Sequence, residues 1–64
     1  MKFKCTHSII QTYFTPNQIY TGQFDYKTQY KTYFKIKSNT GEHIIVQLNG
    51  KDLKFELIKH FTNN

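Results

Sequence analysis

The feature that most constrains the fold is a period-two alternation of apolar and polar side chains on both sides of a turn. It runs through residues 30–37, is interrupted by the turn-forming Ser-Asn-Thr-Gly of residues 38–41, and resumes through residues 42–48. Gly41 can take a positive φ, which such a turn requires. The pattern predicts two strands joined as an antiparallel hairpin. The side chains expected to point into the core are Phe34, Ile36, Ile44, Val46 and Leu48.

Two earlier strands are predicted on either side of a long loop. Residues 2–7 alternate, with Phe3 and Cys5 on the inner face. The loop 8–17 lacks periodicity and ends in a Pro-Asn pair that suits a type II turn, with Asn17 in the left-handed conformation. Residues 18–24 form the second strand. Within it Tyr20 and Phe24 are expected to share a face, and Gly22 between them predicts a bulge or bend.

The last element has two interpretations. Asn49-Gly50 predicts a turn, after which Leu53, Phe55 and Leu57 alternate with charged residues as in a fifth strand. Residues 53–61 also place apolar side chains on one helical face, but no N-cap pattern precedes them. The strand is the favoured interpretation, and the helix stays open.

Chain length and cysteine content limit the architecture. A chain of 64 residues forms one domain, residues 1–64, and buries only about 60% of the surface that its unfolded form exposes. Its single cysteine excludes an internal disulfide, and there is no leading apolar run, so neither a signal peptide nor a membrane span is expected. We therefore expect a cytoplasmic, all-β protein. A small five-stranded antiparallel SH3-like barrel fits best, because closing the sheet removes its edges.

The formal charge of +5 comes from nine basic residues, all of them lysine. Without arginine, any binding to nucleic acid would be directed at the backbone and sensitive to salt, since lysine is a hydrated point charge that cannot read a base edge bidentately. A second explanation is compositional. Lys, Asn, Ile, Tyr and Phe have A/T-rich codons and make up half of the chain. Both explanations of the charge stay open.

The candidate contact surface lies in residues 26–37, which hold four lysines and four aromatic rings. Residues 26–29 are predicted to be a mobile link between the second and third strands, and residues 30–37 are the third strand. The repeated Tyr-Lys-Thr of residues 26–28 and 30–32 is either part of this surface or a local duplication without consequence. The candidate partner-binding residues are Tyr26, Lys27, Tyr30, Lys31, Tyr33, Lys35, Lys37 and Phe61.

No catalytic or metal-binding constellation is predicted. Cys5 and His7 could form a metal pair or an activated thiol only with further ligands from elsewhere, and a core position for Cys5 is the simpler interpretation. The four carboxylates are scattered, so no acid–base pair is indicated. The three glycines are widely separated and form no phosphate cradle. We therefore expect no enzyme activity, no cofactor and no metal.

Short motifs occur along nearly the whole chain, at Lys4-Cys5, Phe14-Thr15, Ile19-Tyr20, Asn39-Thr40-Gly41-Glu42 and Phe55-Glu56. They resemble the corresponding positions of a class of small phage and prophage proteins. That class has a lysine-cysteine pair in its first strand, then a Leu-Thr-x-Gly-Lys-x-Tyr step, a tyrosine-rich strand, an Asn-x-Asn-Gly-Glu hairpin and a last strand that ends in Phe-Glu. The resemblance implies an SH3-like barrel encoded by a phage, with no shared catalytic residues. The chain departs from the class at Asn17, where glycine is usual, and at residues 49–52, which lengthen the last connection.

Two functions follow as hypotheses. In the first, a phage-encoded accessory protein binds and inhibits one host protein, such as an immunity effector or a transcription factor, through aromatic anchors rimmed by lysine. In the second, a nucleic-acid-binding module stacks bases on its tyrosines and neutralises phosphates with its lysines. Either a monomer or a homodimer is compatible with the exposed isoleucines.

Overall fold

The computed structural model describes residues 1–59 and is all-β over that range. Its five strands form one antiparallel sheet in the order β4-β3-β2-β1-β5. No helix occurs among the described residues, so the helical interpretation of the last element is wrong for residues 53–59, and its final positions lie outside the described range. The strands are β1 (Lys2–Ser8), β2 (Ile19–Lys27), β3 (Thr32–Lys37), β4 (His43–Val46) and β5 (Leu53–Leu57).

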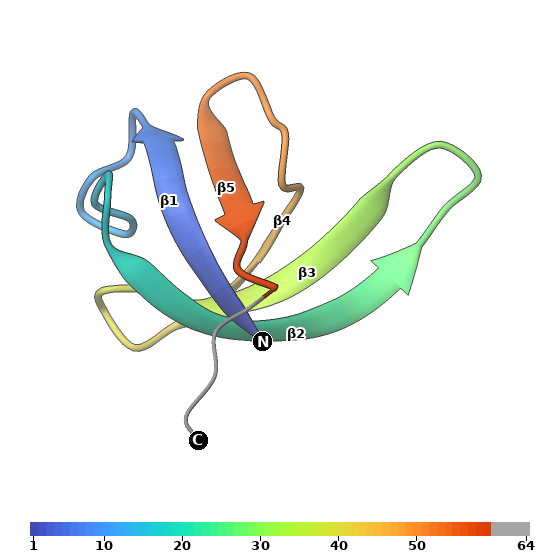
Figure 1. Cartoon of the computed structure of the whole chain (residues 1–64), viewed down its shortest axis with the longest axis horizontal. Coiled ribbons are helices and arrows are strands. Elements are labelled where there is room, and N and C mark those ends of the chain that lie inside the picture. Colours follow the sequence, from blue (N-terminus) through green and yellow to red (C-terminus); the bar gives the residue numbers. More distant parts are fainter. Residues whose placement is uncertain (60–64) are drawn as a thin grey trace.

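Strand β2 holds the two halves of the sheet together because it changes partner along its length. Residues 19–21 pair with β1, and residues from Gly22 onward pair with β3. The strand curves as it passes from one half to the other (Figure 1). A Cβ added at Gly22 would lie 2.8 Å from Ile36 Cγ1, 2.8 Å from the Lys35 carbonyl oxygen and 3.0 Å from Phe3 Cε2. Glycine is therefore required here for close packing.

The core lies between the two halves of the curved sheet. Phe3, Phe14 and Ile36 are completely buried, and Phe14 contacts the rings of Tyr20 and Phe55 edge-on, with centroids 5.1 and 5.0 Å apart. Such edge-to-face pairs contribute about 0.5–1.5 kcal/mol each beyond the area they bury. Among residues 1–59, the buried apolar residues are Phe3, Cys5, Phe14, Tyr20, Phe34, Ile36, Val46 and Phe55.

A polar network fastens the first loop to the β3–β4 turn. The Tyr20 hydroxyl accepts a hydrogen bond from the Thr15 N–H at 2.7 Å and donates to Asn39 Oδ1 at 2.8 Å. The Asn39 side-chain amide donates in turn to Thr15 Oγ1 at 3.1 Å, and the Asn39 N–H donates to the Tyr13 carbonyl at 2.8 Å. The loop is thus held in place although it contains no strand. Its end is the predicted turn, with Asn17 at φ 74°.

The sheet remains open within the described residues, so the closed barrel expected from the sequence is not formed. β4 and β5 are the two edges. The segment after β4 contacts β5 through one isolated bridge, Asn49–Lys54, in which the Phe55 N–H donates to the Leu48 carbonyl at 2.8 Å. The physical reason is that β4 has only four residues before the chain turns towards β5.

Several predicted details hold and others need correction. The predicted hairpin forms with shorter strands, Thr32–Lys37 and His43–Val46, and with Gly41 at φ 89°. Of its five predicted core residues Phe34, Ile36 and Val46 are buried, and Ile44 and Leu48 are partly buried. Of the two alternatives predicted at Gly22, the bulge is absent, because the pairing of Gly22 with β3 is regular, and β2 curves as it passes from β1 to β3 (Figure 1). Tyr20 and Phe24 share a face as predicted, but 52% of the surface of Phe24 is exposed.

The first strand places Cys5 and His7 on opposite sides. Cys5 pairs with Phe55 and His7 pairs with Lys54, so β1 carries one extra residue between them relative to β5. Because neighbouring residues of β5 face opposite sides, so do Cys5 and His7. Cys5 is buried and donates a hydrogen bond from Sγ to the His7 carbonyl at 3.6 Å, whereas the His7 side chain is exposed. The core position predicted for Cys5 is confirmed.

Among residues 1–59 no helix has the length and hydropathy that a membrane crossing requires.

Candidate binding surface

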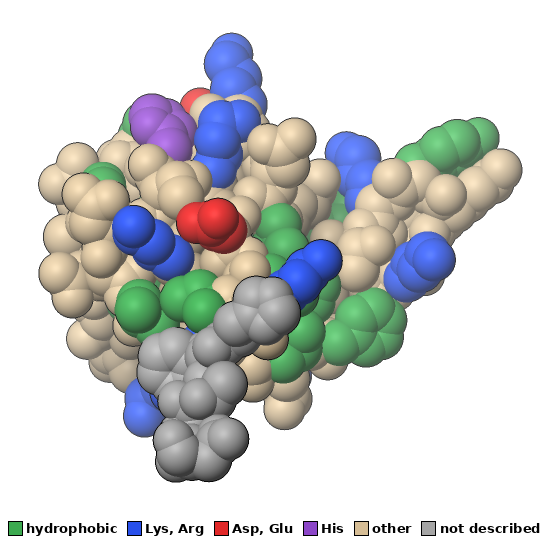
Figure 2. All heavy atoms as spheres, in the orientation of Figure 1, with side chains coloured by type: hydrophobic (Ala, Val, Ile, Leu, Met, Phe, Trp, Pro, Cys, Tyr) green, Lys and Arg blue, Asp and Glu red, His purple; other side chains and the backbone are tan. Residues whose placement is uncertain are grey.

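The far half of β2 and the start of β3 form a two-stranded arm. β1 pairs only with residues 19–21 of β2, and β4 pairs only with residues 34–37 of β3, so residues 24–33 project beyond both neighbours. Figure 1 shows this arm extending away from β1 and β5, and Figure 2 shows hydrophobic side chains along it and at its tip, with lysines beside them. An arm of this kind cannot bury both of its faces against the rest of the chain.

The arm ends in a hydrogen-bonded turn. The Thr28 N–H donates to the Lys31 carbonyl at 2.8 Å, and Thr28 Oγ1 accepts from the N–H groups of Tyr30 at 3.3 Å and Lys31 at 3.0 Å. The link predicted at residues 26–29 is wrong for residues 26 and 27, which belong to β2, whereas residues 28 and 29 do lie between the strands. The difference arises because β2 continues past Phe24 and the chain reverses only at residues 28–31.

A β-bulge at Asp25 decides which side chains share a face of the arm. Phe24 pairs with Phe34, but Tyr26 pairs with Tyr33, so β2 carries one extra residue there. Side chains of a strand normally alternate between faces, and paired residues share a face. The extra residue therefore moves Tyr26 to the face opposite Phe24. Phe24 and Phe34 lie on the inner face, and Tyr26 and Tyr33 lie on the outer face.

The two tyrosines on the outer face stack on each other. The rings of Tyr26 and Tyr33 have centroids 4.5 Å apart and an angle of 17° between their planes. Tyr26 is still 46% exposed, and Tyr33 is half-buried. Stacking fixes the side-chain rotamers before any partner arrives, which lowers the entropy lost on binding. The two rings are therefore already ordered on the surface of the free chain.

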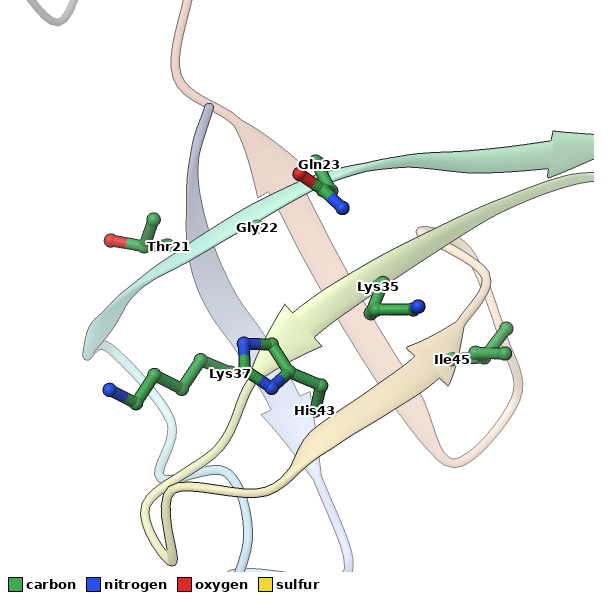
Figure 3. A pocket seen from close by; sticks show the side chains of 7 residues that line it. All are labelled: Thr21, Gly22, Gln23, Lys35, Lys37, His43 and Ile45. Carbon is green, nitrogen blue, oxygen red and sulfur yellow. The ribbon is translucent and has the colours of Figure 1, made fainter.

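The outer face continues from the tyrosines across β3 to β4. Lys35 pairs with Ile45, and Lys37 pairs with His43, so these four side chains share the face that carries Tyr33. With Thr21, Gly22 and Gln23 they line a shallow hollow, and Figure 3 shows their side chains rising from β2, β3 and β4. No carboxylate lines it. We use "outer face" below for Tyr26, Tyr33, Lys35, Lys37, His43 and Ile45.

The predicted contact residues fall into separate groups. Tyr26, Tyr33, Lys35 and Lys37 lie together on the outer face. The remaining four do not join them there. Lys27 pairs with Thr32 on the inner side of the arm, Tyr30 and Lys31 lie in the turn at its tip, and Phe61 lies outside the described residues.

Two members of the outer face were not among the predicted contact residues. His43 and Ile45 come from β4, and Ile45 is 50% exposed. The signal for them was present, because a hairpin centred on residues 38–41 places residue 43 opposite Lys37 and residue 45 opposite Lys35. The bulge at Asp25 had no such signal.

The rest of the described chain offers little chemistry of its own. Burial raises the pKa of the Cys5 thiol, and the backbone hydrogen bond to His7 opposes this only in part. A buried protonated thiol is a poor nucleophile. Within residues 1–59 no group of three or more His, Cys, Asp or Glu side chains lies close enough to hold a metal ion.

Comparison with known proteins gives no family. No protein-family model matches the chain, and searches of the curated proteins and of the solved structures found no significant match.

Proposed function

We propose that this protein is a non-enzymatic binding module that engages another protein through its outer face. The observation that carries the proposal is the Tyr26–Tyr33 stack, in which Tyr26 is exposed and Tyr33 is half-buried. It lies on the same face of the sheet as Lys35, Lys37 and Ile45. Protein interfaces concentrate their binding energy in a few aromatic anchors surrounded by polar residues. The outer face has that composition on a rigid sheet.

The charge of the outer face supports an acidic partner. Lys35 and Lys37 lie on it, no carboxylate lines its hollow, and the chain carries a formal charge of +5. Such a field accelerates the encounter with a negatively charged surface. We further propose that this protein is encoded by a phage and that it inhibits an immunity effector or a transcription factor in the cytoplasm of the host. This proposal rests on the motifs of the sequence and on the small size of the chain.

The proposal extends to the fold family. β2 is shared between a β5-β1-β2 half and a β2-β3-β4 half, and the segment after β4 reaches β5 through a single bridge. This arrangement supports an SH3-like fold whose barrel is left partly open. Such folds host many unrelated functions, so the fold itself does not identify the partner.

A tagged copy purified from its host after nuclease treatment tests the function. We expect one stoichiometric protein partner with the wild-type chain and none with the Tyr26→Ala/Tyr33→Ala variant. Tyr30→Ala, a change at the tip of the same arm, is the matched control and should retain the partner. Recovery of no protein, or equal recovery with the double variant, would contradict the proposal. Thermal unfolding of each variant separates loss of the surface from loss of the fold.

Nucleic-acid binding is the second candidate, and the turn of the arm favours it. Tyr30 is 85% exposed, with Lys31 next to it in the sequence and Lys27 three residues before it, so a base could stack on its ring while the lysines contact phosphates. One stacked base contributes about 1–3 kcal/mol. Fluorescence anisotropy with labelled single-stranded and duplex oligonucleotides at low salt tests this, because counterion release favours binding most there. A flat titration rejects the candidate, and binding that Tyr30→Ala abolishes supports it.

A further inference from the structure

The free edge of β4 has hydrogen-bonding groups that no neighbouring strand uses in the described chain. The Ser38 N–H donates to the Glu42 carbonyl at 2.8 Å, which makes residues 38 and 42 a hydrogen-bonded pair. Because such pairs alternate along an antiparallel ladder, Ile44 also bonds to β3. His43 and Ile45 therefore turn their N–H and C=O groups away from β3, towards the open edge.

This edge lacks most of the protection that natural sheets give to exposed strands. β4 contains no lysine, proline, aspartate or glutamate. β5, at the other edge, carries both Lys54 and Glu56. Charged residues and proline on an edge strand prevent unwanted pairing. In β4, the short length of the strand is the protection that remains. The N–H and C=O groups of His43 and Ile45 are therefore open to pairing with an added strand beside the outer face.

We propose that the β4 edge binds an extended acidic segment of the partner as an added strand, an inference that rests on the proposed function of the outer face. Added strands gain affinity from main-chain hydrogen bonds and specificity from alternate side chains. Acidic side chains on the outer side of the added strand would lie about 10 Å from β3, two interstrand spacings away, within reach of Lys35 and Lys37. A second copy of the chain is disfavoured, because its own +5 charge would repel it.

Nuclear magnetic resonance of the isotope-labelled full chain tests this with a blocked hexapeptide of alternating glutamate and valine. At low salt we expect saturable shifts of the His43 and Ile45 amide signals, which weaken as salt is added. The same peptide with lysine in place of glutamate should give no response. Absence of shifts at these two amides, or equal responses to both peptides, would overturn the inference. Shifts that follow protein concentration without peptide would indicate self-pairing and would also overturn it.

Variants separate the edge from the rest of the surface. Ile45→Pro removes an edge N–H without removing a β3 hydrogen bond and should weaken peptide binding about fivefold. Because proline could also unfold the strand, Lys35→Glu/Lys37→Glu, at one half-buried and one exposed lysine, provides a second test, with an expected loss of about tenfold or more. The control is Lys51→Glu/Lys59→Glu, which changes the net charge by the same amount at two lysines outside the outer face. This variant should bind the acidic peptide nearly as well as the wild type does. Equal losses in the two charge variants would contradict a site at β4.

The two proposals fail differently. If Tyr26→Ala/Tyr33→Ala loses the host partner while the acidic peptide leaves the β4 amides unchanged, strand addition is wrong and the outer face still binds protein. If the peptide binds at β4 but the double tyrosine variant retains the partner, the aromatic anchor is wrong.

Discussion

Replacement of Gly22 by alanine is the sharpest test of how the two halves of the sheet fit together. The new methyl group would lie 2.8 Å from the Lys35 carbonyl oxygen and 2.8 Å from Ile36 Cγ1. The first contact is with the backbone of the paired strand, so it is relieved only if β2 and β3 move apart. Overpacking of this kind costs about 1–3 kcal/mol. The lower conformational entropy of the unfolded alanine chain offsets about 0.4–1 kcal/mol of this cost. Because the closest contact is with backbone, we take the middle to upper part of the overpacking range, which leaves a net loss of about 1–2 kcal/mol.

That loss is large for a chain of this length, whose whole stability is about 3–10 kcal/mol. Circular dichroism should show the unfolding midpoint of Gly22→Ala lowered by about 4–16 °C. Gly41 provides the control, because it has φ 89° and nothing within 4 Å of an added Cβ. Gly41→Asn should leave the unfolding midpoint nearly unchanged, since asparagine accepts a left-handed backbone. At the packed position, Gly22→Asn should lower the midpoint more than Gly22→Ala does. A Gly22→Ala protein that melts within about 2 °C of the wild type would refute the packing argument.

Two further predictions concern buried groups. Tyr20→Phe removes the hydroxyl that joins Thr15 to Asn39 and should lower the free energy of unfolding in urea by about 1–3 kcal/mol; an unchanged midpoint would show that the network is dispensable. Because burial raises the pKa of the Cys5 thiol above its usual 9.0, the stability advantage of the wild type over Cys5→Ala should be complete below pH 9. It should shrink as pH rises through the folded pKa, and unfolding curves that keep a constant difference across this range would contradict that assignment.

The local parts of the fold could be predicted from the sequence because local chemistry fixes them. The hairpin of residues 30–48 follows from alternation on both sides of a glycine-containing turn, and its register follows from the turn. The left-handed Asn17 follows from the preceding proline. In such segments a residue's neighbours in sequence are also its structural partners.

Features set by distant contacts could not be predicted in this way. Phe14 is completely buried because Tyr20 and Phe55 enclose it, although its loop shows no periodicity. The bulge at Asp25 has no mark in the sequence, yet it brings Tyr26 onto the ring of Tyr33. The candidate surface was therefore predicted as a stretch of chain, whereas the structure divides that stretch among two faces and a turn.

The most direct test of the central claim is the affinity of the purified host partner for the Tyr33→Ala chain, measured by isothermal titration calorimetry beside the wild type. If the stacked tyrosines are the anchor, the loss should reach about 2 kcal/mol or more, roughly a thirtyfold rise in Kd, while the fold is retained. Tyr30→Ala should bind nearly as the wild type does. An unchanged Kd for a folded Tyr33→Ala chain would contradict the outer face as the binding surface.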